Sequence, residues 1–195
     1  VVLAALAVLI LGGWTSGTAL AAIGDLTSLV MASVAAVFSA RAARHARGRL
    51  GAAWAALAFG LLGWAVGDAI WAYYELVLHQ FPFPSAADGA YLLLPVGACA
   101  AMLLFPTARS VQSQARLLLD GIIVAGSLFL ASWLTVIRPV YEAGAESRLA
   151  LIIALAYPTA DLVVLTVAAY VVVKAGSGQR LALSLFILGM MFIAL

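Results

Sequence analysis

The stretch LLGWAVGDAIWAYYE, residues 61–75, places two carboxylates, Asp68 and Glu75, in a strongly apolar part of the chain. It belongs to an apolar run over about residues 50–78, which exceeds the roughly 20 helical residues needed to cross the hydrocarbon of a bilayer. Similar runs recur along all 195 residues, of which 66% are hydrophobic and 9% charged. This composition excludes a water-soluble domain and predicts an all-α, polytopic transmembrane helix bundle.

Charges and turn signals divide the chain into about seven predicted spans. These lie near residues 1–18, 20–40, 50–78, 86–106, 117–137, 149–173 and 181–195. The first span begins without the basic lead of a secretory signal, and the last ends without a polar flank. We therefore expect a single integral membrane domain over residues 1–195 that is cut at both ends, with eight or more spans in the full protein.

The basic residues predict the orientation of these spans. Eight of the ten Lys and Arg residues fall in connections on one side, four of them within residues 41–49. By the positive-inside rule this side is cytoplasmic, and so is the N-terminus. The arginine segment could also bind anionic lipid headgroups or a cytoplasmic domain, although such runs more often only fix topology. The bias toward Arg and Ala suggests a bacterial origin, and hence a bacterial plasma membrane.

Four large or acidic side chains share one face of the predicted helix over residues 50–78. Their i, i+4, i+7 and i+11 spacing selects Trp64, Asp68, Trp71 and Glu75. An ionised carboxylate that faces lipid costs at least about 2.5–3.5 kcal/mol, so this face is expected to meet other helices or a hydrated cavity. The alternative is an aromatic belt at the membrane surface, with Asp68 simply hydrated at the boundary.

The stretch ALAYPTADLVVL, residues 154–165, raises the same question nearer the middle of a span. Pro158 lacks an N–H group and should kink the helix, which would free the carbonyl of Ala154. A broken helix with an acid, Asp161, one turn away resembles the ion and ligand sites of transporters. Alternatively, Thr159 and Asp161 only satisfy the loosened backbone.

A third stretch, FPFPSAADGAYLLLP, contains a helix-start pattern, with Ser85 followed three residues later by Asp88. We expect these two side chains to cap the helix that follows. The similarity of PSAAD to PTAD suggests two Pro-to-Asp turns and a weak internal duplication. Asp120, at the cytoplasmic start of the predicted span 117–137, is interpreted as an anchor.

Motifs for catalysis and metal binding are not found in the sequence. It has no phosphate-binding loop, dinucleotide fingerprint, zinc-protease motif or nucleophile elbow. His45 and His79 are predicted on opposite sides of the membrane, and Cys99 is the single cysteine, so no metal site is expected. We assign no catalytic residue and no cofactor to the segment, and we expect no nucleic-acid partner.

Four stretches, GWAVGDAIWAYYE, PFPSAADGAYLLLP, RLLLDGIIVAGSLFLASW and ALAYPTADLVVL, resemble a known membrane region. It is the multi-helix N-terminal part of actinobacterial signalling proteins whose cytoplasmic GGDEF and EAL domains make and degrade cyclic di-GMP. The resemblance covers roughly residues 50–170. It implies a sensory or anchoring input, a homodimer, and a following cytoplasmic enzyme, a diguanylate cyclase or phosphodiesterase, which alone would need GTP and Mg²⁺.

An outer pocket rich in acids and aromatic rings is the candidate receptor site. Its residues are Asp25, Trp64, Asp68, Trp71, Glu75, Asp88, Tyr91, Trp133, Tyr157 and Asp161. The excess of acid favours a small cation, a proton or an amine-bearing molecule as ligand. Two alternatives stay open: a small secondary transporter or ion-coupled channel that uses Asp161, and an anchor without a ligand.

Overall fold

The computed structural model of the chain describes residues 17–105 and 114–174, and these ranges contain helices and no strand. The all-α prediction is therefore confirmed for this part of the chain. Four helices are long and apolar enough to cross a membrane, namely Ala21–His45, Gly48–Leu78, Ala86–Leu104 and Arg148–Val171. The count of about seven spans is not confirmed, and the predicted spans 1–18 and 181–195 fall almost wholly outside the described residues.

The helices begin and end close to the positions predicted from the sequence. In chain order they are α2 Gly17–His45, α3 Gly48–Ala72, the π-helix η1 Tyr73–Leu78, α4 Ala86–Tyr91, α5 Leu93–Leu104, α6 Gln114–Ser132, the π-helix η2 Trp133–Ile137, α7 Arg138–Ala143 and α8 Arg148–Lys174. The predicted span 50–78 thus corresponds to α3 and η1 together. The predicted span 86–106 is divided into α4 and α5 at Leu92, because Pro95 has no N–H to donate to the carbonyl of Tyr91.

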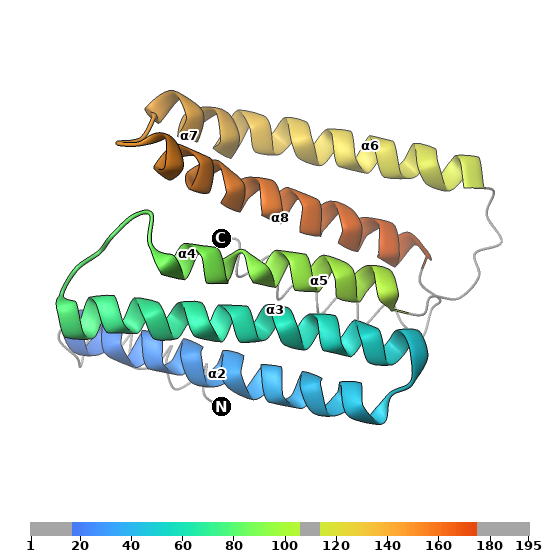
Figure 1. Ribbon diagram of the computed structural model, residues 1–195. Helices are drawn as coiled ribbons and strands as arrows, with labels where there is room; N and C mark the ends of the chain where they lie inside the picture. The colour runs from blue at the N-terminus through green and yellow to red at the C-terminus, as the bar shows by residue number, and fades with distance from the viewer. Residues whose placement is uncertain (1–16, 106–113, 175–195) are drawn as a thin grey trace.

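The long helices lie side by side in one row (Figure 1). α3 packs against α2 on one side and against α4 and α5 on the other, α5 packs against α8, and α8 packs against α6. We call the end of the bundle that holds η1 and residues 79–85 the acidic end. The opposite end, which holds residues 41–49, is the basic end.

Glycines allow α3 and α5 to approach closely. A Cβ atom on Gly97 would lie 2.6 Å from the backbone oxygen of Ala56 and 2.7 Å from the Cα of Gly60. A Cβ on Gly63 would lie 2.6 Å from the Cβ of Leu93. Small residues at such an interface are typical of helices that pack within membranes, where close backbone contact replaces the hydrophobic effect.

At the basic end, one arginine of the segment 41–49 ties two helices together. The guanidinium Nη2 of Arg49 donates to the backbone oxygen of Leu103 over 3.2 Å. Leu103 lies in the last turn of α5, where helix carbonyls lack partners within the helix. The segment therefore contributes to packing, a role that was not anticipated from its charge alone.

The helix that contains Pro158 is not interrupted there, and the kink at Pro158 stays a prediction. α8 continues through Pro158 from Arg148 to Lys174 without interruption. Proline removes a single N–H bond, and the rest of the hydrogen-bond ladder maintains the helix. The hydroxyl of Thr159 donates to the oxygen of Leu155 over 2.7 Å, not to the carbonyl of Ala154 that loses its donor. PTAD therefore lies within a helix, whereas PSAAD begins one, and the pair does not support an internal duplication.

Candidate functional site: a buried carboxylate cluster

Asp68 is the centre of a polar cluster at the acidic end. Only 6% of the residue is exposed, although it lies within a helix that is long and apolar enough to cross a membrane. Ser28 of α2 donates its hydroxyl to Oδ2 of Asp68 over 2.7 Å, and Tyr91 of α4 donates its hydroxyl to Oδ1 over 3.0 Å. Asp68 thus faces neighbouring helices, as predicted, and is not a carboxylate hydrated at the edge of an aromatic belt.

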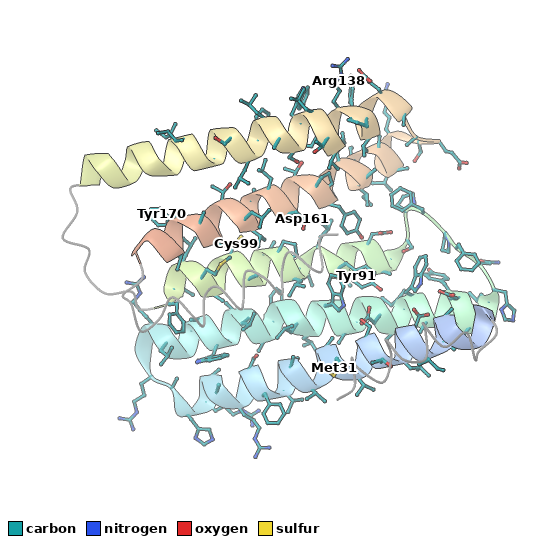
Figure 2. All side chains as sticks on the ribbon, turned by 180° about the vertical axis from the view of Figure 1, so that it is seen from behind. Met31, Tyr91, Cys99, Arg138, Asp161 and Tyr170 are labelled. Atoms are coloured by element: carbon teal, nitrogen blue, oxygen red, sulfur yellow. The ribbon has the colours of Figure 1, made fainter. Side chains whose placement is uncertain are left out.

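Trp64 and Gly67 shape the space around this carboxylate. The rings of Trp64 and Tyr91 lie 4.9 Å apart at an angle of 57°, and the Trp64 indole N–H points to the Ser28 hydroxyl at 3.5 Å. A Cβ on Gly67 would lie 2.6 Å from the Tyr91 ring. Figure 2 shows Tyr91 between α4 and α3, where the missing side chain of Gly67 provides room for it.

Asp25 of α2 and Glu75 of η1 add two further carboxylates. The carboxyl group of Asp25 interacts electrostatically with those of both Glu75 and Asp68. The Trp71 indole N–H donates to Oε2 of Glu75 over 2.9 Å, whereas Oδ2 of Asp25 is buried without a hydrogen-bond partner. The three acids lack a cationic partner, because the only ion pair within the described ranges joins Arg138 to Glu142 at the surface.

Asp88 forms a second centre, on α4. Its Oδ2 accepts from the Ser85 backbone N–H over 2.6 Å and from the Ser85 hydroxyl over 3.0 Å, so the predicted capping role is confirmed. Its Oδ1 accepts from the hydroxyl of Tyr157, on α8, over 2.6 Å. The residue is 8% exposed, and it therefore joins two helices as well as capping one.

Two residues of the predicted pocket are not brought into these centres. Trp133 lies in η2, is 42% exposed, and stacks on Phe129 with ring centres 5.9 Å apart. Asp161 lies one turn after Tyr157 on the side of α8 that faces α5 (Figure 2), but no hydrogen bond joins it to Asp68 or Asp88. The predicted single pocket is thus two hydrogen-bonded centres, with Asp161 and Trp133 apart from them.

A groove of about 760 Å³ opens between α5 and α8, and no acidic residue lines it. Its lining is apolar and includes Pro95, Cys99 and Val163. The hydroxyl of Thr159, which also lines it, is already donated to its own helix. The groove therefore offers shape and apolar contact but no directed polar group.

Sequence reasoning did not identify Ser28 or the glycines of α3 as parts of the site. Ser28 follows Asp25 by one helical turn, so helical spacing alone could have indicated it. Gly60, Gly63 and Gly67 recur on one face of α3, a spacing typical of close helix packing. The π-helix η1, which carries Glu75, had no sequence signal, although short π-helical segments are frequent at functional sites.

Comparison with known proteins adds no further assignment. A scan against protein-family models finds no match, and neither the curated proteins nor the solved structures provide one.

Proposed function

We propose that these helices are the membrane-embedded sensory input of a bacterial signalling protein. The four apolar helices and the buried carboxylates between them support a role within the bilayer. The resemblance of residues 50–170 to the input region of GGDEF and EAL proteins supports cyclic di-GMP synthesis or degradation as the output. The arginines favour a cytoplasmic basic end and N-terminus, with the acidic end outside.

The observation that carries the sensory role is the unbalanced charge around Asp25. Its buried Oδ2 has no hydrogen-bond partner, and its carboxyl group lies beside those of Glu75 and Asp68. Neighbouring carboxylates repel one another, and more strongly in a partly desolvated site. A small cation, a proton or an amine that reached Asp25 and Glu75 would relieve this repulsion, which is the differential affinity that a sensor needs.

The resemblance also implies that two copies of the chain must come together for the cytoplasmic enzyme to work. A diguanylate cyclase must bring two GGDEF modules together, so we propose that the membrane helices act as a homodimer. A change in the packing of the helices within each protomer would then alter how the cytoplasmic modules meet.

The transport alternative has weaker support. It depended on a helix broken near Asp161, whereas α8 is continuous through Pro158. Asp161 also has no hydrogen bond to either carboxylate centre. The transport alternative therefore depends on the acid at position 161.

The test uses the full-length protein in sealed membrane vesicles. Cyclic di-GMP formation from GTP, and its hydrolysis, are measured for the native protein, for Glu75→Gln, and for Glu142→Gln, whose exposed side chain lies outside the cluster. We expect Glu75→Gln to change the activity severalfold and Glu142→Gln to leave it unchanged. An absence of both activities in the native protein would reject the proposed output, and equal activities in all three proteins would reject the sensory role of the cluster.

A further inference from the structure

The short helix α4 contains two residues that bond to different neighbours. Tyr91 donates to Asp68 of α3, and Asp88 accepts from Tyr157 of α8. The two α4 residues are three positions apart, so they lie within one turn of the same helix. α4 therefore provides a polar connection between the α2–α3 pair and α8.

Asp88 performs two tasks with its two oxygens. Through Oδ2 it holds the first turn of α4 at Ser85, and through Oδ1 it holds α8 at Tyr157. Because one carboxylate group serves both contacts, a shift of α4 must move the acceptor that Tyr157 uses. The start of α4 and the position of α8 are thus geometrically linked.

α4 is a separate helical element, bounded at both ends. A connection of seven residues, 79–85, precedes it, and the helical hydrogen bonding changes at Leu92, where Pro95 cannot donate to Tyr91. α4 and α5 both pack closely on α3, since a Cβ on Gly63 would lie 2.9 Å from the backbone oxygen of Ala90 in α4, and a Cβ on Gly60 would lie 3.2 Å from the Cα of Gly97 in α5. A displacement of α3 at the acidic end is therefore passed directly to α4.

We propose that α4 is a coupling element, which transmits a change at the Asp68 cluster to α8 and to the α6 helix packed on it. Loss of the Tyr91–Asp68 bond frees α4, and the movement weakens the Asp88–Tyr157 bond that holds α8. This inference names the regulation of the site under the proposed function and rests on that function only for the nature of the stimulus. The coupling itself is a property of the helices.

The experiment measures the separation of the two sides of the bundle in lipid nanodiscs. Spin labels are attached to cysteines at Phe38 on α2 and Leu130 on α6, which are 66% and 60% exposed, in a Cys99→Ala background. We expect one distance for the parent protein and an additional, longer distance for Tyr157→Phe. The population at the longer distance, relative to the population at the shorter distance, should rise roughly tenfold or more. Hydrogen bonds to charged groups are the stronger class, so their loss shifts the equilibrium by this much.

The decisive variant is Tyr91→Phe, which removes a hydrogen bond to α3 and leaves the Asp88–Tyr157 hydrogen bond to α8 in place. Coupling predicts that it also produces the longer distance, and that the double variant shows no larger change than Tyr157→Phe alone. Tyr141→Phe, at a 63% exposed position on α7, is the matched control and should leave the distance unchanged. Each substitution keeps the aromatic ring, so the variants retain their packing.

Hydrogen exchange of the amides in residues 86–91 gives a second measurement, and they should exchange faster in Tyr157→Phe. An unchanged distance in Tyr157→Phe, an unchanged distance in Tyr91→Phe, or additive effects in the double variant would each overturn the coupling. The distance measurement requires no nucleotide activity. A protein that lacks the proposed output but shows the coupled distances would reject the proposed function and keep this inference.

Discussion

Ser28 and Asp68 lie forty residues apart in the sequence, yet the serine hydroxyl donates to the carboxylate over 2.7 Å. This bond joins α2 to α3 near the acidic end of the bundle. It also shows why a bundle of this composition retains an acid at position 68. The carboxylate is the acceptor that aligns donors from two neighbouring helices.

Replacement of Ser28 by alanine should destabilise the protein. The change removes one of the two donors to Asp68 and leaves the Trp64 indole N–H without its serine acceptor. We expect a loss of about 1 kcal/mol in the free energy of unfolding, as is typical of hydrogen bonds between membrane helices. Unfolding of the purified variant in mixed micelles with increasing dodecyl sulfate measures it. Ser33→Ala, at a partly buried position on the same helix, is the control and should change the stability less.

Gly67→Ala should be more damaging than Gly89→Ala. The added methyl group at position 67 would lie 2.6 Å from the Tyr91 ring, whereas position 89 has no atom within 4 Å. Overpacking of this kind costs about 1–3 kcal/mol, while an alanine in an open helical position is neutral or stabilising by up to about 1 kcal/mol. Thermal unfolding of both variants in the same detergent compares them. Equal melting temperatures would contradict the close packing of Tyr91 on α3.

Asp25→Asn should stabilise the protein in the absence of a ligand. The carboxyl group interacts with those of Glu75 and Asp68, and no cation compensates them within the described ranges. Removing one charge from such a cluster should contribute about 1–2 kcal/mol, allowing for partial solvation. Differential scanning fluorimetry at neutral pH detects the rise in melting temperature. A fall in the melting temperature would indicate that Asp25 is held by a favourable contact instead.

Asp161→Asn tests the transport alternative. In proteoliposomes that contain the purified protein, we expect no ion-dependent solute uptake above that of empty liposomes, and no change with the variant. The reason is that α8 is continuous around this residue and Asp161 is not joined to the carboxylate centres. Uptake by the native protein that the variant abolishes would establish the transporter and reject a pure sensor.

The sequence was most informative where a single physical effect dominates. Hydropathy located α3 with η1, α4 with α5, and α8 within a few residues, because an apolar run that long has few alternatives to a helix. The Ser85–Asp88 pattern predicted its own capping bonds because both partners are local. Helical spacing also placed Asp68 and Trp64 on one face, and the structure brings them to the same cluster.

Features that depend on tertiary contact were not predictable in this way. Tyr157 and Asp88 are 69 residues apart in the sequence. Their hydrogen bond requires α8 and α4 to bring them to the same level along the bundle axis. Pro158 carries a strong local signal for a break, but packing and the rest of the hydrogen-bond ladder maintain α8. The same limit applies to Trp133, which shares its aromatic character with the cluster but packs on Phe129 of its own helical segment.

The glycine contact between Gly60 and Gly97 has a mechanical consequence. Where two backbones nearly touch, neither helix can rotate or slide against the other without a steric clash. We therefore expect α3 and α5 to move together as one rigid pair. Motions that keep this contact intact are displacements of α2, α6 or α8 relative to the α3–α5 pair.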